Sequence, residues 1–129
     1  MSKKLTDSFH VTTTINHERV ANLLCSAFEG GSNYWYCDLE EGHVPDGVTY
    51  KFFHMELPLK GGSVVFDVQG SAKEDDGQLV LDGPAIQRGL QVMAKEYPSH
   101  LADVLTENDD STTGDVFLQC CVFGKLIYG

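Results

Sequence analysis

Basic residues are scarce in this chain and absent from two long stretches of it. The 129 residues include nine Lys and Arg against nineteen Asp and Glu, which gives a formal net charge of −10. No Lys or Arg occurs at 20–50 or at 96–124. Such a charge distribution repels nucleic acid and anionic membranes and favours partners with a basic surface. It also keeps a small domain in solution, which is the alternative reading. Under either reading, we expect no direct binding to nucleic acid.

Long hydrophobic runs are missing as well. No apolar run approaches the ~20 residues that a membrane-spanning helix needs, and residues 1–7 lack the apolar segment of a signal peptide. The four cysteines, Cys25, Cys37, Cys120 and Cys121, do not have the spacing of a disulfide framework. We therefore predict reduced thiols and a protein of the cytosol that does not associate with membranes.

The common catalytic and phosphate-binding motifs do not occur. The chain has no G-x-S-x-G elbow, C-x-x-C pair, H-E-x-x-H or P-loop. Its five histidines show no metal-ligand spacing, and the acidic run 107–110 lacks the alternation of a calcium loop. We predict no metal, no cofactor and no particular catalytic residue. Nineteen carboxylates always offer acid–base pairs, so the question of enzymatic activity stays open.

The pattern of apolar residues predicts one α+β domain at 8–129, preceded by a flexible leader at 1–7. The order β-α-β-β-β-β followed by helices favours an antiparallel sheet of four to five strands with three to four helices packed on one face. Strands are predicted at 9–14, 33–39, 48–55, 63–68 and 78–81, a hairpin loop at 73–77, and helices at 17–28, 84–97, 100–105 and 116–123.

Capping residues mark the predicted helix ends. The expected N-caps are Asn16, Asp82 and Ser99. Thr112 together with Asp115 is similar to a capping box before the last helix, and Gly124 is expected to end that helix.

The most informative stretch begins at Gly30 and Gly31 and contains the only tryptophan, Trp35. A glycine pair ends a helix because glycine takes φ > 0 without steric cost, and the aromatic run after it favours a strand. The segment therefore predicts a helix-to-strand corner. Tyr34 and Trp35 offer the flat amphipathic surface found at interaction sites, although both residues could instead pack in the core.

A pocket at this corner would bring several polar groups to a small ligand. Asn33 and Tyr34 would hold a polar ligand, Arg88 a phosphate, and Gln119 would add a hydrogen bond. An ordinary surface ion pair is the alternative role of Arg88. The candidate ligand-binding residues are Asn33, Tyr34, Trp35, Arg88 and Gln119.

Three segments of the chain resemble a family of small, mostly uncharacterised bacteriophage and prophage proteins. They are residues 27–35 (AFEGGSNYW), 88–90 (RGL) and 110–129, the last with GDVFLQ and FGKLIYG. Lys125 stands where an acidic residue is usual in that family. The resemblance implies a viral origin and the host cytoplasm as the site of action. It supplies no activity for any residue.

These observations favour a non-enzymatic phage accessory protein that binds and inhibits a host protein, such as a component of a CRISPR-type defence system. Its acidic segments at 38–46 and 103–115 would occupy a basic groove in place of DNA phosphates, and binding would weaken with salt. The candidate partner-binding residues are Asp38, Glu40, Glu41, Asp46, Asp103, Glu107, Asp109 and Asp110. The alternative is a small-molecule or nucleotide binder, or a small enzyme, with its pocket near the corner at 33–35. The oligomeric state is not predicted.

Overall fold

The fold is α+β, as predicted. The computed structural model describes residues 8–9, 11–70 and 78–129; the predicted leader at 1–7 and hairpin loop at 73–77 lie outside the described residues. Within them, the chain forms five α-helices and a three-stranded antiparallel sheet, so the prediction of four to five strands was too high. No helix in this described part has the length and hydrophobicity needed to cross a bilayer.

The sheet has the order β1-β2-β3, which leaves β1 at one edge. The strands are β1 (Tyr36–Glu41), β2 (Ser63–Val68) and β3 (Leu79–Asp82). The β1–β2 register shifts between Cys37 and Glu40, where Asp38 has a positive φ of 56°. An irregularity of this kind twists an edge strand and weakens its tendency to pair with another chain.

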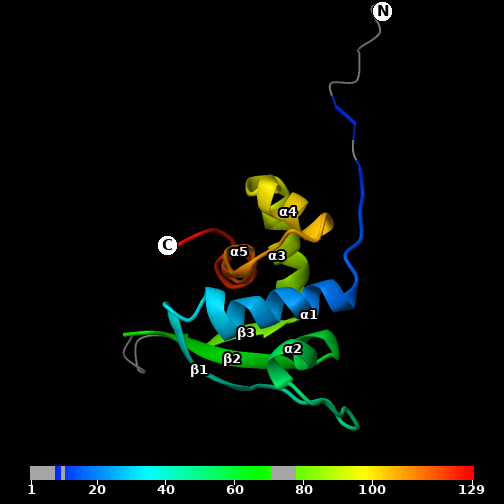
Figure 1. Ribbon diagram of the computed structural model, residues 1–129. Helices are drawn as coiled ribbons and strands as arrows, with labels where there is room; N and C mark the ends of the chain where they lie inside the picture. Colours follow the sequence, from blue (N-terminus) through cyan, green and yellow to red (C-terminus); the bar gives the residue numbers. More distant parts are fainter. Residues whose placement is uncertain (1–7, 10, 71–77) are drawn as a thin grey trace, which may run out of the picture.

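The helices lie in layers over the sheet (Figure 1). They are α1 (His17–Ser26), α2 (Phe53–Glu56), α3 (Gly83–Glu96), α4 (Pro98–Leu105) and α5 (Ser111–Phe123), with a π-helical segment at Ala27–Gly31 and a 3₁₀ turn at Leu57–Leu59. Helix α1 crosses the sheet, and α3, α4 and α5 lie on the other side of α1 (Figure 1). Helix α5 is buried over nine consecutive residues, 113–121, and is the centre of the core.

Most of the predicted helix ends are confirmed. The side chains of Asn16 and Asp82 each accept a hydrogen bond from the backbone N–H three residues later, as N-caps do. Gly124 ends α5 in the left-handed conformation, with φ of 73°. Ser99 is not a cap, because α4 begins one residue earlier at Pro98. Proline favours this first position because its missing N–H needs no partner there.

The last helix begins earlier than predicted. Asp110 caps it by accepting a hydrogen bond from the Thr113 N–H at 3.0 Å, while the Thr113 hydroxyl accepts from the Asp110 N–H at 3.2 Å. This reciprocal pair is the capping box, so the predicted box of Thr112 and Asp115 is wrong. Asp115 lies one turn inside α5 and is buried.

Two predicted strands do not form in the described residues. Phe9 and Val11 are 88% and 92% exposed, on a segment that leads away from the body of the molecule (Figure 1), so the alternation at 9–14 has no neighbouring strand. Residues 48–55 lead into α2 instead. There the Glu56 carboxylate accepts hydrogen bonds from the backbone N–H groups of Lys51 and Phe52, which closes a turn before the helix.

Gly31, the second residue of the predicted glycine pair, is required by close packing and not by a positive φ. Neither Gly30 nor Gly31 has a positive φ, and the chain continues from α1 through the π-helical segment. A Cβ at Gly31 would overlap the carbonyl oxygen of Ser111, whereas one at Gly30 would meet nothing within 4 Å. Gly31 therefore lets the corner approach the N-terminus of α5 closely.

Candidate functional site

The Asp115 carboxylate collects the polar groups of the predicted corner. Its Oδ1 accepts hydrogen bonds from Ser32 Oγ at 2.8 Å, Trp35 Nε1 at 2.7 Å and Gln119 Nε2 at 3.1 Å. Its Oδ2 accepts from Tyr34 Oη at 2.6 Å. We call these five residues the Asp115 network. A buried carboxylate is costly without such donors, so the four bonds hold the corner on α5.

Gln119 extends the network to the end of the chain. Its Oε1 accepts hydrogen bonds from the backbone N–H groups of Ile127 and Tyr128, at 2.8 and 2.9 Å. The Tyr128 ring stacks on Trp35, with ring centroids 5.5 Å apart and planes 11° apart. The segments at 27–35 and 110–129 therefore meet at the Asp115 network.

The polar side chains of the Asp115 network are already hydrogen-bonded to one another or to the backbone. Burial, followed by the hydrogen bond to Asp115 and by its charge, raises the pKa of Tyr34 to about 12. Tyr34 therefore keeps its proton at neutral pH, and its hydroxyl donates a hydrogen bond to the Asp115 carboxylate. Because both carboxylate oxygens and the Gln119 side chain already have partners, the network is suited to anchoring the corner and not to acid–base catalysis.

A cavity of about 370 Å³ lies beside the network, at the start of α5. Its polar lining includes Tyr34, His100, Ser111, Thr112 and Asp115. The Nδ1 atom of His100 is buried and has no hydrogen-bond partner in the described part of the chain. The cavity wall thus contains the His100 ring and a carboxylate whose lone pairs are largely occupied.

The structure brings together three of the five predicted ligand-binding residues. Tyr34, Trp35 and Gln119 meet in the Asp115 network, although only Tyr34 lines the cavity. Asn33 is exposed, and its carbonyl oxygen accepts a hydrogen bond from Gln69 at 2.6 Å. Arg88 is exposed on α3 and does not line the cavity.

The predicted acidic segments differ in how the fold uses them. Asp38, Glu40, Glu41 and Asp46 are all exposed, on β1 and the turn after it. None of the four forms an ion pair with a residue that the structure describes. In that part of the molecule no basic side chain neutralises this group, which we call the β1 acidic group, although Asp38 accepts a hydrogen bond from Cys37 Sγ at 3.7 Å and Glu41 one from Tyr50.

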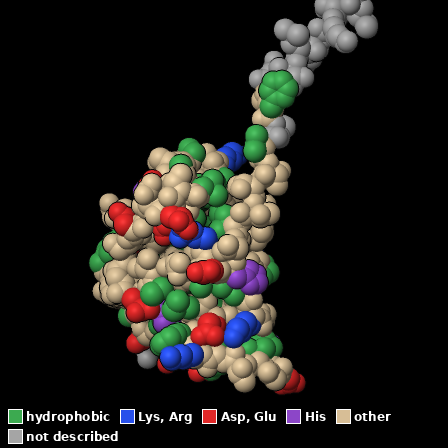
Figure 2. Space-filling model, turned by 45° about the vertical axis from the view of Figure 1, so that its right-hand side comes forward, with side chains coloured by type: hydrophobic (Ala, Val, Ile, Leu, Met, Phe, Trp, Pro, Cys, Tyr) green, Lys and Arg blue, Asp and Glu red, His purple; other side chains and the backbone are tan. Residues whose placement is uncertain are grey.

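The acidic residues between α4 and α5 are partly committed to the fold. Arg19 pairs with Glu107 at 3.0 Å and lies 3.6 Å from Asp109. Hydrogen bonds from the first turn of α5 hold the pKa of Asp110 below its usual value, and Asp103 is half-buried. This connection and β1 lie on different sides of the molecule (Figure 1), and the face in Figure 2 mixes acidic with basic side chains. The two acidic segments thus do not form one continuous face.

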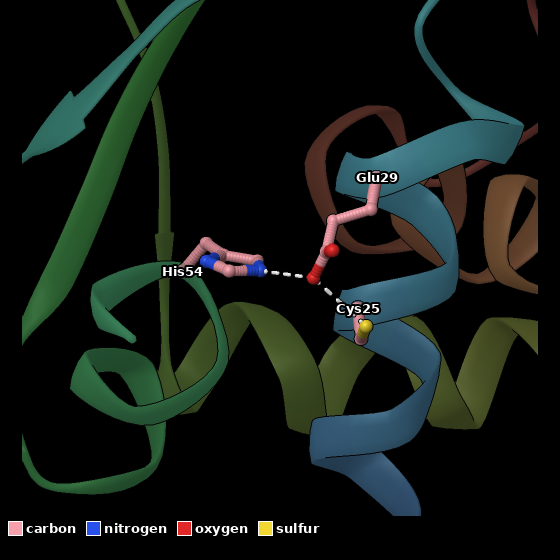
Figure 3. Close-up of side chains that lie close together, drawn as sticks. All are labelled: Cys25, Glu29 and His54. Carbon is pink, nitrogen blue, oxygen red and sulfur yellow. Dashed lines mark hydrogen bonds and ion pairs between the residues drawn. The ribbon is translucent and has the colours of Figure 1, made fainter. Parts of the chain in front are cut away.

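A third cluster joins Cys25, Glu29 and His54 (Figure 3). Glu29 Oε2 accepts a hydrogen bond from Cys25 Sγ at 2.9 Å and lies 2.7 Å from His54 Nε2. The hydrogen bond to Glu29, followed by burial and the charge of Glu29, raises the pKa of Cys25 to about 11. The thiol therefore keeps its proton at neutral pH and is not an activated nucleophile.

Sequence reasoning missed several of these groups. Asp115 was assigned to a helix cap, and Ser32 and His100 carried no signal of their own. The i, i+4 spacing of Cys25 and Glu29 places both on one face of a helix and could have been noticed. The third member, His54, comes from α2, within a segment that was predicted as a strand.

Comparisons of the chain with protein-family models, with curated proteins and with solved structures find no match. A functional interpretation therefore rests on the motifs and on the geometry of these sites.

Proposed function

We propose that the protein is a phage accessory protein that binds and inhibits a host protein in the host cytoplasm, through the β1 acidic group. The observation that carries this proposal is that Asp38, Glu40, Glu41 and Asp46 are exposed together with no ion pair to the described residues. A protein that holds DNA in a basic groove, such as a CRISPR-type defence component, is a partner with complementary chemistry.

The β1 acidic group supports the proposal better than the acidic residues at 103–110. The latter are partly neutralised by Arg19 or used as a cap by Asp110. Charges at a sheet edge also protect a protein from edge-to-edge aggregation, which is the competing explanation for this group. The two explanations differ in one respect, because only partner binding predicts a complex whose affinity falls with salt.

The test is affinity capture from an extract of the bacterial host at low and high salt, read by mass spectrometry. The tagged wild-type protein is compared with a variant that carries Asp38→Asn, Glu40→Gln, Glu41→Gln and Asp46→Asn. The matched control removes the same number of charges outside both acidic segments, by Glu18→Gln, Glu74→Gln, Asp75→Asn and Glu96→Gln.

We expect one stoichiometric partner with the wild type and the control at low salt, and its loss at high salt. The β1 variant should not retain that partner. Equal capture by the β1 variant and the wild type, or capture that does not respond to salt, would contradict the proposal. Loss with both variants alike would place the effect in the total charge and not in β1.

A small ligand in the cavity beside Asp115 is the second candidate function. The His100 ring in the wall of this cavity favours it, because an imidazole can exchange hydrogen bonds with a polar ligand. A thermal-shift screen of nucleotides and sugars tests it, with His100→Ala as the comparison. A compound that raises the melting temperature of the wild type but not of His100→Ala would support this function, and a screen without hits would count against it.

A further inference from the structure

The side chains of Cys25, Glu29 and His54 converge from three segments of the chain: α1, the π-helical segment and α2. Their sulfur, oxygen and nitrogen atoms all lie within 4.8 Å of one another. In Figure 3, His54 on α2 points toward Cys25 and Glu29, which lie on α1 and on the π-helical segment that continues it. A thiol, a carboxylate and an imidazole are the three side-chain types that bind Zn²⁺ in proteins.

The spacing of the ligand atoms fits one ion. Zn²⁺ binds sulfur at about 2.3 Å and nitrogen or oxygen at about 2.0–2.2 Å, so tetrahedral ligand atoms lie about 3.5 Å apart. Here the carboxylate oxygen lies 2.9 Å from the sulfur and 2.7 Å from the nitrogen. The sulfur and the nitrogen lie within 4.8 Å of each other. An ion that replaces the two hydrogen bonds therefore requires the carboxylate to withdraw and the sulfur and nitrogen to approach each other, by shifts of about 1 Å.

The groups around the cluster hold His54 in place. The edges of Phe28 and Phe53 contact its ring, with centroids 6.3 and 6.0 Å away. Phe28 is buried, and its carbonyl oxygen accepts a hydrogen bond from the Tyr36 hydroxyl. Glu29 lies on a π-helical segment, a feature that occurs often at functional sites. The imidazole is thus oriented before any ion arrives.

The cluster is closed on the protein side and open on the solvent side. The His54 side chain is 14% exposed, whereas that of Glu29 is 56% exposed. An ion can therefore enter from solvent, and a water molecule can complete its coordination. Three protein ligands with one open position is the arrangement of zinc sites at which the metal acts on water or on a substrate.

The arrangement does not suit a cysteine nucleophile. In a cysteine–histidine pair the imidazole lies against the sulfur and takes its proton. Here the Glu29 carboxylate stands between Cys25 and His54 and contacts both. A divalent cation between the three groups would bind all of them at once, and the Cys25 thiol would release its proton to solvent as the metal–sulfur bond forms.

We propose that Cys25, Glu29 and His54 bind a divalent transition-metal ion of the Zn²⁺ class, with a fourth coordination position open to solvent. The site is separate from the β1 acidic group, and its test does not depend on any partner.

Titration of the reduced, chelator-treated protein with Co²⁺ tests the site by absorption spectroscopy. We expect one Co²⁺ per chain, with a charge-transfer band from a thiolate ligand, and its displacement by Zn²⁺ but not by Mg²⁺. A wild-type protein without this band, or a band that Mg²⁺ removes, would overturn the proposal.

Variants locate the ion. Cys25→Ser should abolish the thiolate band, and His54→Gln should weaken Co²⁺ binding by at least about tenfold. The matched controls are Cys37→Ser, at another half-buried thiol, and His43→Ala, at an exposed imidazole; both should bind as the wild type does. A band that survives Cys25→Ser and disappears in Cys37→Ser would refute this ligand set.

A second measurement uses the unaltered chain and so does not depend on a variant folding. Iodoacetamide labelling is followed by mass spectrometry with and without Zn²⁺. Zn²⁺ should protect Cys25 and leave the labelling rate of Cys37 unchanged. Equal rates at Cys25 with and without the ion would contradict the proposal.

Discussion

Asp115 and Glu29 each receive hydrogen bonds from several side chains, but in opposite surroundings. Asp115 is 8% exposed and is bonded by Ser32, Tyr34, Trp35 and Gln119, none of which carries a charge. The Glu29 side chain is 56% exposed, and its neighbours are a thiol and an imidazole. The first carboxylate is buried beside the core, and the second lies at the surface of the molecule.

The two carboxylates differ in whether other groups can replace their hydrogen-bond partners. The donors to Asp115 come mostly from residues 80 to 83 positions away in the sequence, so the bonds connect the corner to α5. Breaking these hydrogen bonds would leave buried donors without an acceptor. The neighbours of Glu29 are themselves metal ligands, and solvent can replace any bond that is broken. We infer that Asp115 serves the fold and that Glu29 is available for binding.

Replacing Asp115 by alanine should produce the largest effect. The substitution leaves four buried or half-buried donors without their acceptor, so we expect a loss of about 3–5 kcal/mol in the free energy of unfolding. Urea denaturation monitored by circular dichroism measures it. A loss below about 1 kcal/mol would show that the Asp115 network does not hold the corner.

The glycine pair allows a finer test of the same contact. Gly31→Ala should destabilise the protein by about 1–3 kcal/mol, because its Cβ would overlap the Ser111 carbonyl oxygen and push the corner away from α5. Gly30→Ala is the control, since a Cβ there meets nothing within 4 Å. Thermal unfolding of both variants gives the comparison. Equal losses of stability at the two positions would mean that the close contact with Ser111 does not explain why residue 31 is a glycine.

The helix ends were predictable because their signals are local. The caps at Asn16, Asp82 and Gly124 depend only on neighbouring backbone groups, which are always within reach. Where two local signals compete, the pattern misleads. Asp110 and Thr112 could each begin a capping box, and the boundary of α5 decides which one does.

The side chains that meet in each site could not be predicted from local signals. Tyr34 and Trp35 mark the corner by composition, but their acceptor Asp115 lies 80 or more residues away. The strand predicted at 48–55 failed because Glu56 bonds to backbone N–H groups and closes a turn there. That turn leads into α2, which brings His54 to Glu29, so the third cluster could not be found before the fold was known.

The Tyr34 hydroxyl should make stability depend on pH in the alkaline range. Its pKa rises from 10.0 to about 12 in the folded protein, so the folded state holds this proton more tightly than the unfolded chain. The stabilising effect is complete below pH 10 and is lost as the pH rises through about 12. The melting temperature of the wild type should therefore fall more than that of Tyr34→Phe across this range. Parallel curves for the two proteins would contradict the assignment.

Replacing Glu29 by alanine should produce the smallest effect, although it also removes a carboxylate with two partners. In metal-free protein we expect a loss below about 1 kcal/mol, because Glu29 is largely exposed and solvent can hydrate Cys25 and His54 in its absence. The same denaturation experiment as for Asp115→Ala measures it, at low and high salt. A loss as large as that of Asp115→Ala would mean that Glu29 also holds the fold together, and the contrast between the two carboxylates would no longer separate a structural role from a binding one.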